Sequence, residues 1–186
     1  KLIQNKFAVC IEKVKVFPVF NIDLIKDCNK NLDINNNNYL YVADSSKHKN
    51  HKNLLSAWEL FAKNNKKVFS LNLTIPENES NKNLLFRINR LVNNGYKIIN
   101  HKNCNHSEIM NLYERCNYVI FPSLTESFGL PLVEAASAGC KIICADRPYV
   151  YQVIKPSLVF NPIDVNSILN SLNLSKNYHK VDKSEL

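Results

Sequence analysis

The chain has 186 residues, of which 45% are hydrophobic and 22% charged, and these values are typical of a soluble globular protein. That length allows one domain with a substantial core, and no window has the long uncharged apolar run of a membrane span. The net charge of +8 predicts an acidic partner, and nucleic acid, anionic lipid headgroups and phosphorylated ligands are all candidates. Nucleic acid is the weakest of them, because the lysines are dispersed and no aromatic platform for stacking bases is present.

Short segments rich in Val, Ile, Tyr and Phe alternate with amphipathic helical patterns along the chain. The seven predicted strands are Val14 to Phe20, Tyr39 to Ala43, Val68 to Thr74, Lys97 to Asn100, Tyr118 to Phe121, Lys141 to Cys144 and Leu158 to Phe160. The helical patterns between them include Lys52 to Lys63, Ser80 to Asn93 and Ser107 to Cys116. Trp58 and Phe61 lie on one face of the first pattern, and this helical spacing predicts that they belong to the core. Strands separated by helices need crossover connections, so the pattern predicts an α/β fold with a doubly wound, mainly parallel sheet and helices on both faces.

We expect residues 1–186 to form a single domain. The Asn-rich stretch 29–38 is typical of a disordered loop. The polar tail 177–186 is expected either to fray or to belong to a helix that packs elsewhere.

A strand, a loop and a helix start follow one another between Tyr118 and Ala135. Pro131 lies where proline is favoured, in the first turn of the predicted helix. The start of a helix presents unpaired N–H groups and a partial positive charge, so the amides around Phe128, Gly129 and Leu130 could hold a phosphate.

Two glutamates bracket this helix start, and their spacing bears on the kind of ligand. Glu126 lies in the loop and Glu134 about one turn into the helix, so they can lie on opposite sides of one ligand. Carboxylates accept hydrogen bonds from hydroxyls, and a nucleotide sugar has hydroxyls on both sides of its diphosphate. The alternative is a surface loop residue and a glutamate that complements the helix dipole, and the spacing alone does not choose.

The segment from Glu126 to Glu134, with seven residues between the two glutamates, resembles the signature of retaining glycosyltransferases of the GT-B fold, especially family 4. Three further segments resemble the same family in the right order, namely 39–57, 139–146 and 159–164. The resemblance runs from about Lys13 to the C-terminal region. It implies one Rossmann-like half of a GT-B fold, the donor-binding half, without the N-terminal acceptor domain.

The resemblance also implies roles for individual residues. Lys49 would neutralise the donor diphosphate, Glu126 would contact the donor sugar and Glu134 would accept hydrogen bonds from the ribose. Lys49 and Glu126 are the implied catalytic residues, and the implied donor-binding residues are Lys49, Glu126, Ser127, Phe128, Gly129, Leu130 and Glu134. The alternative for Lys49 is a solvated loop lysine, because several basic residues lie close together there.

The sequence departs from the family in one respect. Many members carry an arginine shortly before the lysine, whereas Ala43, Asp44 and Ser45 occupy that region here. Lys47, His48 and Lys52 are the candidates to replace it.

The function that follows is a donor domain of a hexosyltransferase. It would bind UDP- or GDP-hexose for retaining transfer to a glycan or lipid-linked acceptor, as in lipopolysaccharide or capsule synthesis, and would be inactive alone. No cofactor or metal is expected, since the family generally uses none and no Asp-x-Asp pair is present. The expected location is the cytoplasm, with peripheral contact to the anionic cytoplasmic membrane as a further option. Two alternatives stay open: an epimerase or phosphorylase on the same fold, and a non-catalytic nucleotide-binding or interaction domain.

Overall fold

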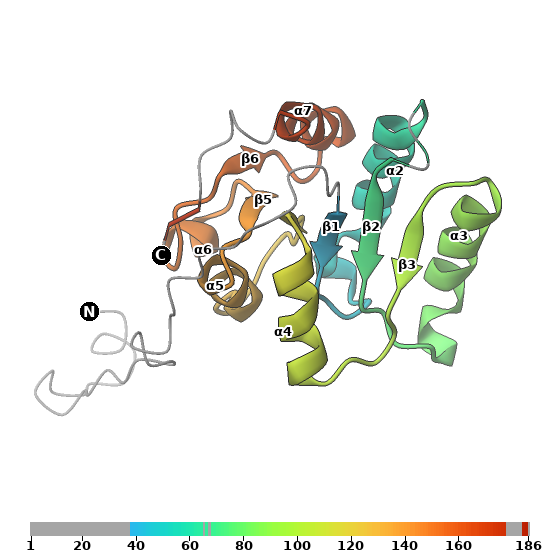
Figure 1. Cartoon of the computed structure of the whole chain (residues 1–186), viewed down its shortest axis with the longest axis horizontal. Helices are drawn as coiled ribbons and strands as arrows, with labels where there is room; N and C mark the ends of the chain where they lie inside the picture. The colour runs from blue at the N-terminus through green and yellow to red at the C-terminus, as the bar shows by residue number, and fades with distance from the viewer. Residues whose placement is uncertain (1–37, 65, 67, 178–183, 186) are drawn as a thin grey trace, which may run out of the picture.

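The computed structural model describes residues 38–64, 66, 68–177 and 184–185, and their strands form one parallel sheet (Figure 1). The strands are β1 (Asn38–Tyr41), β2 (Ser70–Leu73), β3 (Ile98–Asn100), β4 (Tyr118–Phe121), β5 (Lys141–Ala145) and β6 (Leu158–Phe160). Their order across the sheet is β3-β2-β1-β4-β5-β6, and every neighbouring pair runs parallel. The predicted α/β class and parallel sheet are therefore confirmed.

Six of the seven predicted strands are present in the described part of the chain, and the seventh, at 14–20, lies outside it. All of β4 and all of β5 is buried, and β4 is apolar along its whole length, whereas β5 begins with the buried Lys141 and is apolar after it. That pattern is expected of a parallel sheet covered by helices on both faces, because neither side of a strand then meets water.

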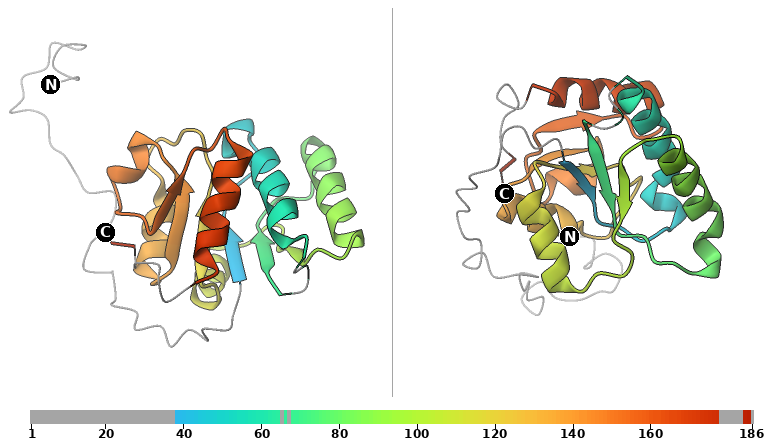
Figure 2. Two further views of the ribbon diagram at one scale, coloured as in Figure 1. Left: turned by 90° about the horizontal axis from the view of Figure 1, so that it is seen from above. Right: turned by 45° about the vertical axis from the view of Figure 1, so that its right-hand side comes forward.

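The helices are α2 (His51–Ala62), α3 (Lys82–Asn93), α4 (His106–Arg115), α5 (Leu130–Ser137), α6 (Pro148–Tyr151) and α7 (Val165–Ser175), with short 3-10 turns η3 (Lys47–Lys49) and η4 (Glu79–Asn81). One face of the sheet carries α2, α3 and α7, and α4 and α5 lie on the other face (Figure 2).

No helix within the described residues combines the length and apolar character needed to cross a bilayer.

Local sequence explains where the helices begin. Asn105 and Glu108 form a capping box at α4, in which each side chain accepts a hydrogen bond from the other residue's backbone N–H. The side chain of Asp164 accepts a hydrogen bond from the N–H of Asn166 at the start of α7.

Trp58 is fully buried and Phe61 is 3% exposed, so both belong to the core, as their helical spacing predicts.

The two segments expected to be irregular lie mostly outside the described residues. Asn38, the last residue of the predicted loop 29–38, is instead the first residue of β1. In the predicted tail 177–186, Glu185 forms an antiparallel bridge with Lys155, and the Ser184 hydroxyl accepts a hydrogen bond from the N–H of Ile142. These two residues of the tail therefore lie against the edge region of β5 and β6.

Candidate functional site

The predicted site residues follow the two strands at which the strand order reverses. Beginning at β1, the order runs to β2 and β3 on one side and to β4, β5 and β6 on the other. In doubly wound sheets ligands bind beyond the carboxyl ends of the strands at such a switch point, because the two crossover connections leave in opposite directions there. The loop after β1 carries Lys49, and the loop after β4 carries Glu126.

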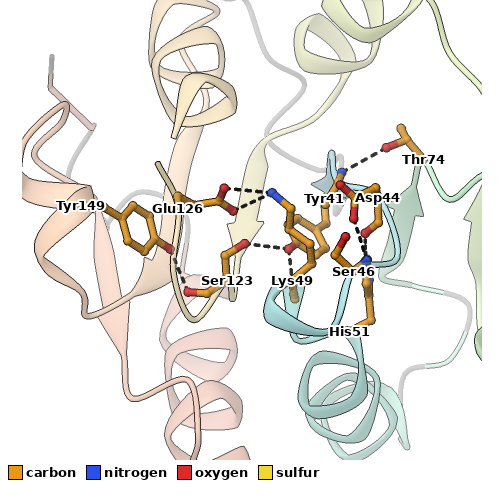
Figure 3. Close-up of polar contacts among 10 residues, drawn as sticks. Tyr41, Asp44, Ser46, Lys49, His51, Thr74, Ser123, Glu126 and Tyr149 are labelled. Atoms are coloured by element: carbon orange, nitrogen blue, oxygen red, sulfur yellow. Dashed lines mark hydrogen bonds and ion pairs between the residues drawn. The ribbon is translucent and has the colours of Figure 1, made fainter. Parts of the chain in front are cut away.

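Lys49 and Glu126 form an ion pair across this switch point (Figure 3). The Lys49 Nζ lies 2.8 Å from Oε1 and 2.9 Å from Oε2 of Glu126, so the ammonium bridges both carboxylate oxygens. Their side chains are 14% and 11% exposed. A charged pair held so far from water interacts more strongly than a surface pair, and the two predicted catalytic residues therefore act as one unit.

A buried hydroxyl network lies beneath the pair (Figure 3). The Tyr41 hydroxyl donates to the Lys49 carbonyl at 2.8 Å and lies 3.0 Å from the Ser123 Oγ. The Tyr149 hydroxyl donates to the Ser123 carbonyl at 2.9 Å. Burial raises the pKa of Tyr41 and of Tyr149, so both phenols stay protonated and keep donating. The sequence analysis did not identify Tyr41 or Ser123, which meet although they are 82 residues apart in the chain.

The loop after β1 is ordered by its own short contacts. The Asp44 carboxylate accepts a hydrogen bond from the Ser46 N–H at 2.6 Å, and the Asp44 carbonyl lies 2.6 Å from the His51 Nε2. Partial burial raises the pKa of Asp44, but the hydrogen bonds from Ser46, with Lys49 and His48 nearby, outweigh it and lower the pKa overall. Burial lowers the pKa of His51, so this imidazole is neutral near pH 7 and donates from Nε2.

The helix start predicted to bind phosphate is present. Gly129 precedes α5 with φ 82 and ψ 37, a left-handed conformation that favours glycine, and Pro131 lies in the first turn. No side chain among the described residues caps α5, and its first turn contains no acidic residue. Ser127 and Leu130 are exposed, while Phe128 is half-buried. The loop thus ends at a helix start whose partial positive charge is not offset by an acidic side chain of its own first turn.

Glu134 faces α4 and not the ion pair. The Tyr113 hydroxyl donates to its Oε2 at 3.3 Å, and the His106 Nδ1 lies 3.8 Å from its Oε1. Burial raises the pKa of Glu134, with Tyr113 and His106 partly offsetting that effect. The two glutamates therefore have separate partners, and His106 lies beside Glu134.

A pocket of about 360 Å³ lies beside the ion pair, and of the predicted site residues Lys49 lines it, whereas Glu126, Glu134 and residues 127–130 are not part of its lining. Lys49 and Pro131 both line it, so the cation and the first turn of α5 share one cavity. The loop after β3 contributes Lys102 and Asn103 to the same lining. Lys102 adopts a left-handed φ of 62 and pairs with Glu77 at 3.0 Å.

This geometry bears on the missing arginine. Lys47 and Lys52 line a different pocket, at the start of α2, and His48 lies in η3 and lines neither pocket. Lys102 is the second cation that lines the Lys49 pocket within the described residues. No sequence spacing signals this, because Lys102 arrives from a different strand end.

Three polar residues near Lys102 differ in role: Asn100 at the end of β3, and His101 and Asn103 in the loop after it. The Asn100 side chain exchanges hydrogen bonds with the backbone of Ile75, and His101 Nε2 lies 2.9 Å from the Asn72 Oδ1. The side chains of Asn100 and His101 are therefore hydrogen-bonded within the protein, whereas Asn103 lines the pocket.

In the described part of the chain, no three His, Cys, Asp or Glu side chains gather as a metal site would require.

Solved structures share this architecture. A UDP-forming α,α-trehalose-phosphate synthase from Burkholderia xenovorans superposes with a TM-score of 0.67 at 13% identity, over 77% of this chain and 37% of the synthase. The fold is therefore that of one Rossmann-like half of a GT-B glycosyltransferase, as the sequence analysis expected.

The sequence comparisons define the family. The family model described as glycosyl transferases group 1 matches residues 26–174, and the chain belongs to that family. O-antigen chain mannosyltransferase B of Escherichia coli is 36% identical over 58 residues, which cover 31% of this chain and 15% of that protein. O-antigen chain mannosyltransferase RfbU of Salmonella typhimurium is 32% identical over 62 residues, which cover 33% of this chain and 18% of that protein. The chain thus matches only a small part of these relatives' length.

Proposed function

We propose that this chain is the donor-binding domain of a retaining hexosyltransferase and binds a nucleotide diphosphate sugar at the β1/β4 edge. The observation that carries the proposal is the Lys49–Glu126 pair beside the pocket that Lys49 shares with the first turn of α5. A cation that lines this cavity and a helix start beside it suit a diphosphate, because both favour negative charge.

The diphosphate is the leaving group of the transfer. When the bond between the sugar and the phosphate breaks, negative charge builds on the diphosphate oxygens, and a preorganised cation and N–H donors stabilise that charge in the transition state. Lys49 supplies the cation, and the backbone around Phe128, Gly129 and Leu130 supplies the donors. Ser127, exposed in the same loop, contributes a hydroxyl. Lys102 adds the second positive charge from across the pocket.

The ion pair gives Glu126 a role that changes on binding. Both of its oxygens lie within hydrogen-bond distance of the Lys49 ammonium before a ligand arrives. A diphosphate that binds Lys49 competes with this carboxylate, and Glu126 then accepts hydrogen bonds from the hydroxyls of the donor sugar. Donor binding and sugar recognition are thereby linked through one ammonium group.

Glu134 binds the ribose. Its Oε2 accepts a hydrogen bond from Tyr113, which fixes the carboxylate, and the remaining acceptor positions are open to two ribose hydroxyls. Because burial raises the pKa of Glu134, its ionised form, which is the better acceptor, is less favoured than in water. Nucleotide binding should therefore weaken as the pH falls towards that pKa.

The names of the relatives support the finer assignments. Two are O-antigen mannosyltransferases, which favours a hexose such as mannose and a polysaccharide or lipid-linked acceptor. Retention of configuration, a site without a metal ion, and an acceptor held by a separate N-terminal domain follow from the resemblance to family 4. The net charge of +8 suits peripheral contact with the anionic cytoplasmic membrane.

Calorimetric titration with UDP and GDP tests the proposal. We expect saturable binding of one of them, and Glu134→Ala should weaken it more than Glu126→Ala, because Glu126 faces the sugar that these nucleotides lack. The reverse order would overturn the two assignments, and no binding of either nucleotide at millimolar concentration would overturn the function.

A further inference from the structure

Asn50 joins η3 to α2 directly after Lys49 and has an unusual backbone conformation. Its φ of 60 and ψ of 30 are left-handed, a region that costs most residues about 1 kcal/mol or more and that asparagine tolerates better than others. Its N–H donates to the Lys47 carbonyl, and its carbonyl accepts from the Leu54 N–H. The left-handed residue therefore ends one helical turn and begins the next.

The side chain of Asn50 connects three parts of the fold. It is buried, and its Nδ2 donates to the Pro122 carbonyl at 3.1 Å and to the Pro162 carbonyl at 2.7 Å. Pro122 is the first residue after β4, and Pro162 lies just after β6. Both N–H bonds of the amide are used, and both acceptors are main-chain carbonyls. The amide therefore links the backbone after β4 to the backbone after β6.

Asn50 and the ion pair connect the same two loops. Lys49, its neighbour, belongs to the loop after β1, and Glu126 lies four residues beyond Pro122 in the loop after β4. The distance between the ammonium and the carboxylate depends on how these loops lie, and a displacement of about 1 Å would break the two short contacts, because hydrogen bonds weaken steeply with distance. One backbone bond, from the Leu124 N–H to the His48 carbonyl at 2.7 Å, supports the same alignment.

We propose that Asn50 is a positioning residue: its amide sets the separation of Lys49 and Glu126 and thereby shapes the diphosphate site. The expected effect of Asn50 on ligand binding rests on the proposed function. The expected effect of Asn50 on the Lys49–Glu126 pair requires no ligand and can be measured in the chain alone.

Asn50→Gly is the first test variant, because glycine adopts the left-handed conformation freely and only the amide is lost. Asn50→Asp is the second, because aspartate has the same shape and tolerates this conformation, but its carboxylate cannot donate to the two carbonyls. The matched control is Asn53→Ala. Asn53 donates to the same Pro162 carbonyl at 3.1 Å from the first turn of α2, and it has no bond to the loop after β4.

Two measurements are made on each variant in the full chain. The first is the affinity for UDP and GDP by calorimetry. The second is the coupling between Lys49→Met and Glu126→Gln in a double-mutant cycle, taken from urea unfolding without nucleotide.

Both Asn50 variants should weaken nucleotide binding by about tenfold or more, as expected for a misplaced charge at a binding site, and should abolish the coupling. Asn53→Ala should change the affinity by less than about twofold and keep the coupling, although it loses a similar bond. Equal effects of the Asn50 and Asn53 variants, or an intact coupling in Asn50→Gly, would overturn the proposal. If the unmodified chain binds neither nucleotide, the proposed function fails, and the coupling alone then decides the role of Asn50.

Discussion

Removing the Lys49 ammonium should destabilise the chain, and removing its partner as well should restore part of the loss. Lys49→Met keeps the length of the side chain but leaves the Glu126 carboxylate, 11% exposed, without its cation. At 2.8 Å and an effective dielectric constant of about 20, the gross attraction is about 6 kcal/mol, most of which offsets the hydration that both groups lose.

The net cost follows from the burial of the pair. Exposed pairs contribute about 0–1 kcal/mol, and breaking a fully buried pair costs about 3–5 kcal/mol. With 14% and 11% of the side chains exposed, Lys49→Met should cost about 2–3 kcal/mol of unfolding free energy. The double variant Lys49→Met/Glu126→Gln buries no charge and should regain about 1 kcal/mol of that loss.

Urea unfolding followed by circular dichroism measures all four members of this cycle. The Lys49→Met loss corresponds to a fall in melting temperature of about 5–10 °C for a domain of this size. If the two single changes add within about 0.5 kcal/mol, the pair is not coupled, and the inference that Lys49 and Glu126 act as a unit would be refuted.

Three further predictions concern the surroundings of the pair. Tyr41→Phe removes the hydroxyl that donates to the Lys49 carbonyl, and the control Tyr118→Phe removes a buried hydroxyl that donates to the Ser175 carbonyl. Each change should lower the free energy of unfolding by about 1 kcal/mol, but only Tyr41→Phe should weaken nucleotide binding in calorimetry. Equal affinities of the two variants would contradict this. Gly129→Ala should cost about 1–2 kcal/mol in urea unfolding because its φ is +82, and an unchanged stability would be inconsistent with that strain. Burial raises the pKa of Glu134 in the folded state above its unfolded value of 4.5, so the folded state binds this proton more tightly. The free energy of unfolding should therefore fall as the pH rises from the unfolded pKa to the folded pKa, and Glu134→Gln should become more stable relative to wild type towards neutral pH. A stability difference that does not vary with pH in urea unfolding would argue against this.

The fold could be predicted from sequence because its signals are local. The apolar runs at 118–121 and 141–144 are what a strand buried on both sides requires, and the helical spacing of Trp58 and Phe61 correctly places them in the core. The order of the strands is not local information, and the structure supplies it.

The site could be predicted only in part, for the same reason. Pro131 and Gly129 mark the start of α5 through their own backbone preferences. Lys102 joins the site from the end of β3 and stands in no motif with Lys49. Tyr41 lies in the same segment as Lys49, but its contact with Ser123 crosses to the loop after β4. Their roles depend on distances across the sheet, which no spacing along the chain encodes.

The central claim is that the β1/β4 edge binds the diphosphate of a nucleotide sugar. The most direct test is to titrate the isotope-labelled chain with UDP and GDP and follow the amide resonances by NMR. The account predicts saturable shifts that concentrate at Lys49 and at residues 128–130, with smaller ones around Glu134. Saturable shifts confined to another face, for example along α7, or no shifts at millimolar nucleotide, would contradict it.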